Sequence, residues 1–309
     1  MQPDRHVPRI RELIAEAEYL LADGPHPERA RRDAEELFLH ILREGARDKN
    51  NAWMVSHGIT KDINSAWLAA HRDTPTNLAV SARLRDLVER RRGGEPIQYL
   101  MGETEFYGLP FHVTRDVLIP RPETEHLIEK VIELALDFPG PRIVDIGTGS
   151  GCITVALAHH LPQAQITSID LSASALAVAR KNAKRNEVTV SFLEGDLLSP
   201  VAGEQFDFVV SNPPYVPSTD RASLSVEVRD FEPAMALFAG DDGLEVYRSL
   251  IPAAFDVLVP GGFLLLEIGY GQSTAVAELL SRSGFAQIEF TPDLQGIPRV
   301  ACAQRQSIV

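Results

Sequence analysis

A glycine-rich segment in the middle of the chain is the first candidate for a ligand-binding site. Residues 144–151, with the sequence VDIGTGSG, carry glycines at three alternate positions directly after an apolar run. Glycine lets the backbone turn tightly and approach a ligand closely, although such a turn can also be purely structural. The spacing is one residue shorter than the dinucleotide fingerprint G-x-G-x-x-G, which argues against a nicotinamide or flavin cofactor. The candidate cofactor-binding residues here are Gly147, Thr148, Gly149, Ser150 and Gly151.

Two carboxylates follow the next two apolar runs of the chain. Asp170 ends the run 167–170 and lies 25 residues after Asp145. A carboxylate at the end of a second strand can accept hydrogen bonds from both hydroxyls of a ribose, or it can cap the next helix together with Ser172. Asp196 follows the third run, where it can accept a hydrogen bond from the exocyclic amine of an adenine while Leu197 packs on the ring.

The sequence Asn-Pro-Pro-Tyr at 212–215 follows a further apolar run, 206–210. Prolines fix φ and lack a backbone donor, so the carbonyl groups of Asn212 and Pro213 are left as acceptors. With the side-chain carbonyl of Asn212 they can converge on one planar NH2 group, and Tyr215 offers an aromatic surface. The alternative is a rigid proline turn, but ligands bind at such strand ends in α/β sheets. We expect substrate contacts from Asn212, Pro213, Pro214 and Tyr215, with Asn212, Pro213 and Tyr215 catalytic and Asn212 also touching the cofactor.

The apolar runs that carry these residues alternate with helical patterns from residue 142 onward. Such alternation predicts the α/β fold class, with a parallel sheet covered on both faces. The expected strands are 143–146, 166–169, 188–193, 206–210 and 263–268, with 287–290 and 299–303 as further candidates. Helices are expected from about 152 to 160 and after 120–125, and a hairpin is expected from strands 104–107 and 111–113 joined by 108–110.

The first 95 residues show helical patterning and form a separate expected domain. Apolar residues recur at spacings of three and four, which predicts a small helical bundle. The helical stretches are 10–21, 28–43 and 78–92, and the polar stretch 45–77 shows only Trp53 and Trp67 as apolar anchors. Arg90, Arg91 and Arg92 form either a basic recognition patch or the cationic last turn of a helix, the interpretation we favour. We expect a helical domain at 1–95 and a second domain at 96–309.

The charge of the chain is divided unevenly between these two domains. Residues 1–95 contain 16 Lys and Arg against 16 Asp and Glu, whereas residues 96–309 contain 14 against 27, so the whole net charge of −13 lies in the second part. This distribution argues against a binder of duplex nucleic acid, which needs a basic surface. We expect no direct nucleic-acid partner.

Cysteine and histidine usage gives little support for a disulfide framework or a metal site. Cys152 and Cys302 are the only cysteines, which favours a reducing, cytoplasmic setting. His159 and His160 can approach Cys152 on one helix, but without further ligands we expect no metal. The chain also lacks an apolar run of 18 residues or an N-terminal signal pattern, so we expect neither a membrane span nor secretion.

The glycine loop, Asp170 and residues 212–215 together resemble the class I S-adenosylmethionine-dependent methyltransferases that act on NH2 groups bonded to sp2 carbon. Upstream segments are similar to one family within that class, the peptide chain release factor glutamine methyltransferases, also called the PrmC/HemK family. The segments that carry this resemblance are 95–100 (EPIQYL), 105–108 (EFYG) and especially 118–125 (LIPRPETE), with 31–35, 231–233 and Leu237 in support. The resemblance covers most of the chain, and only 45–77 is longer than the family pattern.

The resemblance implies a helical, substrate-docking domain, then a hairpin and a Rossmann-like methyltransferase domain. It implies S-adenosylmethionine as the cofactor and, as the acceptor, the side-chain amide nitrogen of the glutamine in the Gly-Gly-Gln loop of release factors. Glu123 and Glu125 either touch the cofactor or suit the positive end of the helix that they begin.

Three other functions use the same residues. An adenine-N6 methyltransferase of DNA or RNA shares the chemistry of the Asn-Pro-Pro-Tyr sequence, because a flipped adenine also presents an NH2 group. A ribosomal protein L3 glutamine methyltransferase is closer still, but its family differs after the Pro-Arg pair, where this chain has Pro-Glu-Thr-Glu at 122–125. A non-catalytic S-adenosylmethionine-binding or translation-associated docking protein would need these acceptor residues to be damaged, whereas residues 212–215 are intact.

Overall fold

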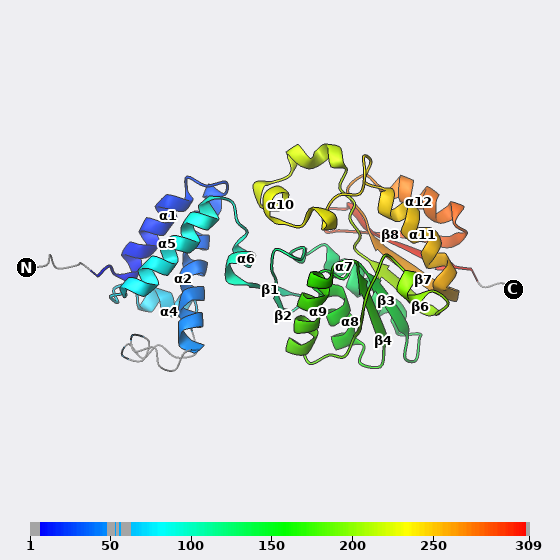
Figure 1. Ribbon diagram of the computed structural model, residues 1–309, viewed down its shortest axis with the longest axis horizontal. Helices are drawn as coiled ribbons and strands as arrows, with labels where there is room; N and C mark the ends of the chain where they lie inside the picture. Colours follow the sequence, from blue (N-terminus) through cyan, green and yellow to red (C-terminus); the bar gives the residue numbers. More distant parts are fainter. Residues whose placement is uncertain (1–6, 48–52, 54–55, 57–62, 307–309) are drawn as a thin grey trace, which may run out of the picture. The chain divides into compact units, whose positions relative to one another are not determined.

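The computed structural model describes residues 7–47, 53, 56 and 63–306, coloured along the chain in Figure 1. These residues divide into two compact units, Met1–Met101 and Gly102–Val309.

The first unit is a bundle of helices, as the spacing of its apolar residues predicts. The larger helices α1, α2 and α5 contribute most of its core, which includes Leu13, Phe38 and Leu87. Trp53 and Trp67, the two expected apolar anchors, pack against this core. Two of the helices start at an asparagine whose side chain accepts a hydrogen bond from the first turn, as N-cap residues do. The helices are α1 (Ile10–Leu21), α2 (Ala30–Arg47), α4 (Ser65–Ala70), α5 (Leu78–Arg92) and α6 (Ile97–Met101), with a short 3-10 turn at Pro27–Arg29.

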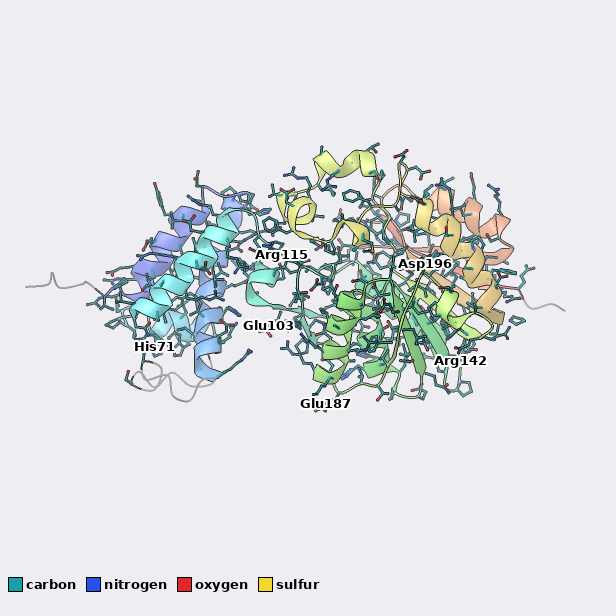
Figure 2. All side chains as sticks on the ribbon, viewed as in Figure 1. His71, Glu103, Arg115, Arg142, Glu187 and Asp196 are labelled. Carbon is teal, nitrogen blue, oxygen red and sulfur yellow. The ribbon has the colours of Figure 1, made fainter. Side chains whose placement is uncertain are left out.

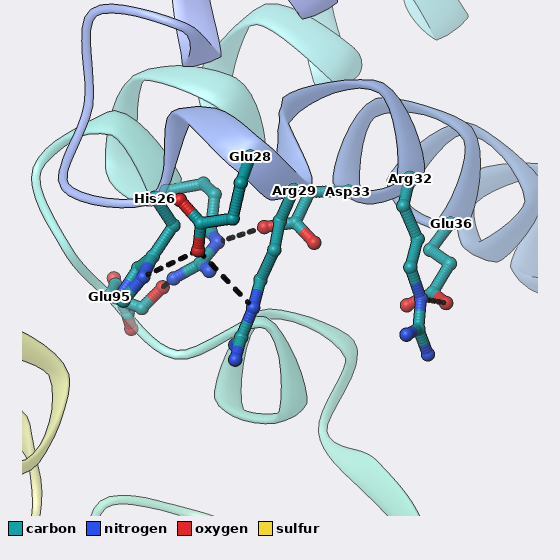
Figure 3. Close-up of polar contacts among 8 residues, drawn as sticks. His26, Glu28, Arg29, Arg32, Asp33, Glu36 and Glu95 are labelled. Carbon is teal, nitrogen blue, oxygen red and sulfur yellow. Dashed lines mark hydrogen bonds and ion pairs between the residues drawn. The ribbon is translucent and has the colours of Figure 1, made fainter.

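The basic triplet at the end of α5 is engaged in ion pairs within the first unit. Arg91 is buried and donates from Nε to Oδ2 of Asp33 at 2.6 Å. Arg90 forms two hydrogen bonds with the carboxylate of Glu95, and Arg92 pairs with Glu89. Figure 3 shows Asp33 and Glu95 with their dashed contacts. The triplet therefore serves the helix end and the fold of this unit, as the cationic-turn interpretation predicts.

The second unit is built around a seven-stranded sheet of order β5-β4-β3-β6-β7-β9-β8. Its first five strands in that order are parallel, and β9 and β8 add an antiparallel edge. The α/β prediction is thus confirmed. The strands are β3 (Arg142–Ile146), β4 (Gln165–Asp170), β5 (Ser191–Glu194), β6 (Phe206–Ser211), β7 (Leu258–Glu267), β8 (Phe285–Pro292) and β9 (Pro298–Arg305).

Helices cover both faces of this sheet. Alternate residues of each strand enter different cores: Ile143 packs with α7 and α8, whereas Val144 packs with α11 and α12. This alternation follows from the pleat, which points successive side chains to opposite faces. The helices of the unit are α7 (Thr124–Ala135), α8 (Cys152–His160), α9 (Ala173–Arg185), α10 (Val226–Phe231), α11 (Glu245–Val257) and α12 (Ser273–Arg282).

A two-stranded hairpin, β1 (Glu103–Phe106) and β2 (Leu109–His112), opens the second unit. The expectation that residues 108–110 form its turn is wrong, because the turn is Tyr107-Gly108 and Pro110 pairs with Glu105. Both turn residues have positive φ, 51° and 70°, which is the backbone that a two-residue hairpin turn requires. The expected strand 188–193 is also shorter, since β5 begins at Ser191.

Asn182 of α9 joins the hairpin to the glycine loop. Its side-chain amide accepts from the backbone N of His112 and donates to the carbonyl oxygens of His112 and Ser150, at 2.7 to 2.9 Å. Asn182 is fully buried, so these three hydrogen bonds are protected from water. Arg185 adds an ion pair of 2.8 Å to Glu103, which Figure 2 labels at the start of β1. The hairpin is thus fixed to α9, the helix that packs against the glycine loop.

Candidate active site

The glycine loop connects β3 to α8 in a tight turn. Gly147, Gly149 and Gly151 have φ of 72°, 54° and 80°, in the left-handed region that residues with a Cβ rarely adopt. A Cβ on Gly151 would lie only 3.1 Å from Cβ of Ala179 in α9. The backbone N of Gly147 donates to the carbonyl of Ile169 at 2.8 Å, which holds the loop against β4. All three glycines therefore meet a conformational requirement, and Gly151 meets a packing requirement as well.

Asp170 lies at the end of β4 and faces this loop. One of its carboxylate oxygens accepts from the backbone N of Gly149 and the other from the backbone N of Ser172, both at 2.8 Å. Ser172, not Asp170, is the residue that caps α9, where it accepts from Ala175. Each carboxylate oxygen has a further lone pair, so Asp170 can accept hydrogen bonds from a ligand while it orders the loop.

A buried polar cluster lies beneath the loop. Asp145 is fully buried and accepts hydrogen bonds from the hydroxyls of Thr154 at 2.8 Å and Ser168 at 3.2 Å. Burial raises the pKa of Asp145 to about 6, and the hydroxyl donors, which include Thr148, act in the opposite direction. The cluster connects β3, β4 and α8 at the point where the loop turns.

The end of the next strand contributes Asp196 and Leu197. Gly195, Asp196 and Leu197 directly follow β5 and line the same cavity as the glycine loop. In Figure 2, Asp196 lies at the carboxyl edge of the parallel strands, whereas Arg142 begins β3 at the opposite edge. Leu197 also packs on the apolar core beside the sheet.

One cavity of about 420 Å³ brings most of the expected site residues together. From the loop, residues 147–150 and Cys152 line it. The other expected site residues that line it are Asp170, Asp196, Leu197, Asn212, Pro213 and Pro214. The volume is in the range of small-molecule sites. Tyr215 and Gly151 do not line this cavity. The strand ends of β3, β4, β5 and β6 therefore converge, as expected for the open edge of a parallel sheet.

Tyr215 is held behind the cavity by a carboxylate that sequence reasoning did not identify. Its hydroxyl donates to Oε1 of Glu267 at 3.2 Å, and Oε2 of the same carboxylate accepts from the hydroxyl of Thr124 at 2.6 Å. Oγ1 of Thr124 in turn accepts from Nδ2 of Asn212 at 3.1 Å. The side chains form one chain of hydrogen bonds from the cavity wall into the protein interior.

The interior end of this chain is electrostatically unusual. Glu267 is 1% exposed, and burial raises its pKa to about 7 although hydrogen bonds from Thr124 and Tyr215 oppose the shift. Burial and the charge of Glu267 raise the pKa of Tyr215 well above its ordinary value. Carboxylates with perturbed pKa values concentrate at functional sites, which makes Glu267 a candidate functional residue.

An ion pair links two segments at the cavity rim. Nη2 of Arg121 donates to Oε1 of Glu232 at 2.6 Å, and the other oxygen of Glu232 accepts from the backbone N of Ile119. Arg121 comes before α7, and Glu232 follows α10. Arg115, labelled in Figure 2, lies with its guanidinium 5.1 Å from the ring centre of Phe231. These contacts connect the segment 115–121 to the segment 231–236, and both line the cavity.

Three acidic or hydroxyl side chains around α7 have distinct positions. Thr124 lines the cavity, whereas Glu123 and Glu125 do not. Oε1 of Glu125 accepts from the backbone N of Tyr107 at 3.0 Å, so it supports the hairpin turn. The sequence carried a signal for Glu267 that went unused: like Asp170, it is a carboxylate at the end of a buried apolar strand.

The weaker candidates from the sequence do not form a site in the described residues. No group of three potential metal ligands occurs in that part of the chain. His160 hydrogen-bonds to the carbonyl of Ala156 and packs edge-on against Tyr107. Burial raises the pKa of the Cys152 thiol to about 12, so it is protonated at neutral pH. No helix of the described residues has the length and apolarity needed to cross a membrane.

Two parts of the chain match known protein families. The Methyltransferase small domain family matches residues 124–235, and the PrmC N-terminal domain family matches residues 48–102. Among solved structures, the hMettl16 catalytic domain in complex with a MAT2A 3'UTR hairpin has a TM-score of 0.53 at 18% identity, covering 80% of this chain and 93% of that one. The fold is thus that of a Rossmann-like methyltransferase.

Curated relatives narrow the class to one family. The release factor glutamine methyltransferase of Geobacter sulfurreducens is 46% identical over 228 residues, which cover 74% of this chain and 80% of the relative. The enzyme of the same name from Salmonella typhimurium is 38% identical over 292 residues, covering 94% and 97%. The chain belongs to the release factor glutamine methyltransferase family.

Proposed function

We propose that this chain transfers a methyl group from S-adenosylmethionine to the side-chain amide nitrogen of the glutamine in the Gly-Gly-Gln loop of peptide chain release factors. One observation carries the proposal: Asn212 and Pro213, which can clamp an NH2 group, line the same cavity as Asp170 and the glycine loop. A methyl donor and an amide acceptor can therefore meet in one enclosed volume, which is what a direct transfer between them requires.

The cavity residues fit this cofactor. Asp170 has free lone pairs for the two ribose hydroxyls while its oxygens accept from Gly149 and Ser172. Asp196 can accept from the adenine amine, and Leu197 offers an apolar surface to the ring. The left-handed glycines leave no side chain between the loop backbone and the ligand. When bound, the cofactor supplies a methyl group that its sulfonium charge makes easy to transfer.

Asn212 and Pro213 act on the acceptor. An amide nitrogen is a poor nucleophile because its lone pair is delocalised into the carbonyl group. Carbonyl oxygens of Asn212 and Pro213 accept its two N–H groups, fix the nitrogen in line with the methyl carbon, and stabilise the positive charge that develops on it. With the cofactor bound, transfer would form the nitrogen–carbon bond and break the carbon–sulfur bond of the cofactor, and one N–H proton would leave to water.

No strong base is needed in this mechanism. The pKa of Tyr215 is raised by burial and by Glu267, so its hydroxyl stays protonated at neutral pH. Tyr215 therefore acts through the position of its side chain and of the loop that it ends, not by removing a proton. Its backbone oxygen accepts from Nε2 of Gln272 at 3.0 Å, which helps to hold the loop 212–215.

Charge favours a protein substrate over duplex nucleic acid. Residues 96–309 contain 27 acidic and 14 basic residues, and this negative net charge repels a polyanion at long range. A protein, in contrast, can present one flexible loop to the cavity. We also place the reaction in the cytoplasm, because both cysteines are free thiols.

Mass spectrometry of purified release factor, incubated with this protein and S-adenosylmethionine, tests the function. We expect a single methyl group on the glutamine of the Gly-Gly-Gln loop and none on a factor in which that glutamine is alanine. Duplex DNA and ribosomal protein L3 serve as competing acceptors. Methylated adenine in the DNA, or methylated L3 beside an unmodified release factor, would contradict the proposal.

The first unit is proposed to dock the release factor. It is a compact unit with its own hydrophobic core. Deletion of residues 1–101 should reduce transfer to intact release factor while S-adenosylmethionine binding, measured by calorimetry, is retained. Equal transfer rates for the full chain and the deletion variant would rule out a docking role.

A further inference from the structure

We propose that Thr124 and Glu267 are positioning residues that hold the side-chain amide of Asn212 with its carbonyl oxygen toward the substrate. The inference rests on the proposed role of Asn212 as an acceptor for the glutamine NH2 group, and it adds the device that keeps Asn212 in the accepting orientation.

The geometry joins three elements that are far apart in the sequence. Asn212 follows β6, Thr124 begins α7, and Glu267 ends β7. Nδ2 of Asn212 lies 3.1 Å from Oγ1 of Thr124, which lies 2.6 Å from Oε2 of Glu267. Thr124 and Glu267 are each 1% exposed, so water does not compete for these hydrogen bonds.

The chemistry of the groups sets the direction of this chain. An ionised carboxylate only accepts hydrogen bonds, so the single hydroxyl hydrogen of Thr124 is committed to Glu267. Oγ1 of Thr124 is then only an acceptor toward Asn212. Asn212 must therefore direct its NH2 group to Thr124, which leaves Oδ1 at the opposite end of the amide.

Orientation matters because the two ends of an asparagine amide are similar in shape but opposite in hydrogen bonding. In the structure, Oδ1 of Asn212 accepts no hydrogen bond from any described residue, and Asn212 lines the cavity. A rotation of the amide by 180° would present N–H groups to the N–H groups of the substrate. Such an arrangement would repel the nucleophile instead of stabilising its developing charge.

Ionisation of Glu267 links this device to pH. The groups that face the carboxylate are Thr124 and Glu123 at the start of α7, Tyr215 after β6, and Arg299 in β9. Tyr247 of α11 donates to its backbone oxygen at 2.8 Å, and Cys152 of α8 also senses its charge. A protonated Glu267 can donate to Thr124, which frees the threonine hydrogen and removes the preference of Asn212 for one orientation. Burial raises the pKa of Glu267 to about 7, so this loss falls near neutral pH.

Single-turnover methyl transfer to release factor is measured for Thr124→Val, Thr124→Ser and Glu267→Gln, each with a calorimetric affinity for S-adenosylmethionine. Thr124→Val should slow transfer by about 10-fold or more, the equivalent of one well-placed hydrogen bond, with cofactor affinity within about 2-fold. Thr124→Ser should restore the rate. Tyr247→Phe is the matched control, because it removes a buried hydroxyl beside Glu267 and leaves the side-chain contacts intact; its rate should stay within about 2-fold.

The pH profile separates positioning from simple loss of structure. The wild-type rate should fall as pH drops through about 7 because Glu267 becomes protonated, whereas Glu267→Gln should lower the rate and lose this transition. A normal rate in Thr124→Val, or an unchanged pH profile in Glu267→Gln, would overturn the proposal.

Nuclear magnetic resonance of the Asn212 side chain gives a readout that does not depend on activity. The NH2 resonances, identified by their loss in Asn212→Ala, should exchange slowly in the wild type and in Thr124→Ser, and rapidly in Thr124→Val. Fast exchange in the wild type would refute the positioning role. Slow exchange together with no methylation of release factor would support the positioning of Asn212 by Thr124 and Glu267 and would refute the proposed function.

Discussion

Asp33 of the first unit and Glu267 and Asp145 of the second unit are buried carboxylates with different kinds of partner. In the first unit, Asp33 is 5% exposed and pairs directly with Arg91, which is 2% exposed. In the second unit, Glu267 and Asp145 are more deeply buried, yet their hydrogen-bond partners are the hydroxyls of threonine, serine and tyrosine. Arg91 neutralises the buried charge of Asp33 with a guanidinium, whereas neutral donors surround Glu267 and Asp145.

The difference separates structural from functional burial. A buried ion pair is a direct contact between two side chains of the fold, so this one fixes α2 against α5 and offers nothing to a ligand. Burial raises the pKa values of Glu267 and Asp145 to about 7 and about 6, although the hydrogen bonds from their hydroxyl partners oppose the shift. Their partners reach the cavity through Thr124 and Thr148, which both line it.

Removal of the buried ion pair in the first unit should have the largest effect on stability. Asp33→Ala leaves Arg91 buried without its charge partner, which we expect to cost about 3 to 5 kcal/mol of unfolding free energy. Urea unfolding followed by tryptophan fluorescence measures this unit alone, because both tryptophans, Trp53 and Trp67, belong to it.

The control for this prediction is an exposed pair on the same helix. Arg32 and Glu36 form an ion pair of 2.9 Å on the surface of α2, where Figure 3 shows them apart from Asp33. Glu36→Ala should cost no more than about 0.5 kcal/mol. Similar losses for Asp33→Ala and Glu36→Ala would mean that burial does not distinguish the two pairs.

The second prediction concerns the site of the second unit. Asn212→Ala should slow methyl transfer by roughly 100-fold or more, about 2.7 to 4 kcal/mol, as for loss of one preorganised group that faces developing charge. Asn212→Asp should be milder because a carboxylate still accepts hydrogen bonds. Single-turnover rates measure the effect, and a near-normal rate for the alanine variant would refute the role of Asn212 as an acceptor for the substrate NH2 group.

The third prediction uses the raised pKa of Glu267. Its folded pKa of about 7 lies above the ordinary 4.5, so the folded state binds the proton more tightly. Its contribution to stability is full below pH 4.5 and is lost as pH rises through about 7. Relative to Glu267→Gln, the wild type should lose about 3 kcal/mol over this interval, the free-energy equivalent of the pKa shift.

Hydrogen exchange of amides in β6 and β7, followed across this pH range, measures the difference. Glu204→Gln is the control, because Glu204 is an exposed partner of Arg142. That variant should track the wild type at every pH. A constant difference between the wild type and Glu267→Gln from pH 4 to pH 8 would contradict a neutral-range pKa for Glu267.

The smallest expected effect is on cofactor affinity. Asp170→Ala removes a carboxylate that both orders the glycine loop and is proposed to bind the ribose. We expect S-adenosylmethionine binding to weaken by about 1.5 to 3 kcal/mol, the scale of hydrogen bonds to a charged group. Calorimetry measures it, and unchanged affinity would exclude the ribose assignment.

The parts of the site that the sequence predicted share one property: each lies at the end of an apolar strand or just after it. The glycine loop, Asp170, Asp196 and Asn212 lie at the ends of β3 to β6, and parallel strands bring their carboxyl ends to one edge of the sheet. Local pattern and a general rule of topology were sufficient for them.

The hydrogen bonds that join Asn212, Thr124 and Glu267 could not be predicted in this way. Thr124 and Glu267 are 143 residues apart, and their contact exists only because α7 packs beside β7. Neither the burial of Glu267 nor the direction of its hydrogen bonds can be inferred from strand periodicity. The predicted hairpin turn at Gly108-Leu109-Pro110 is wrong for a local reason. Glycine and proline mark a turn in the sequence, but Tyr107 adopts positive φ and the turn begins one residue earlier.

Asn182 gives the second unit a mechanical property as well. The chain enters this unit at Gly102, and the hairpin that follows is clamped to α9 through Asn182 and Arg185. Because Asn182 also holds the carbonyl of Ser150, tension on the chain at Gly102 has a stiff path to the glycine loop. A displacement of the hairpin would thus be transmitted to the glycine loop through the hydrogen bonds of Asn182.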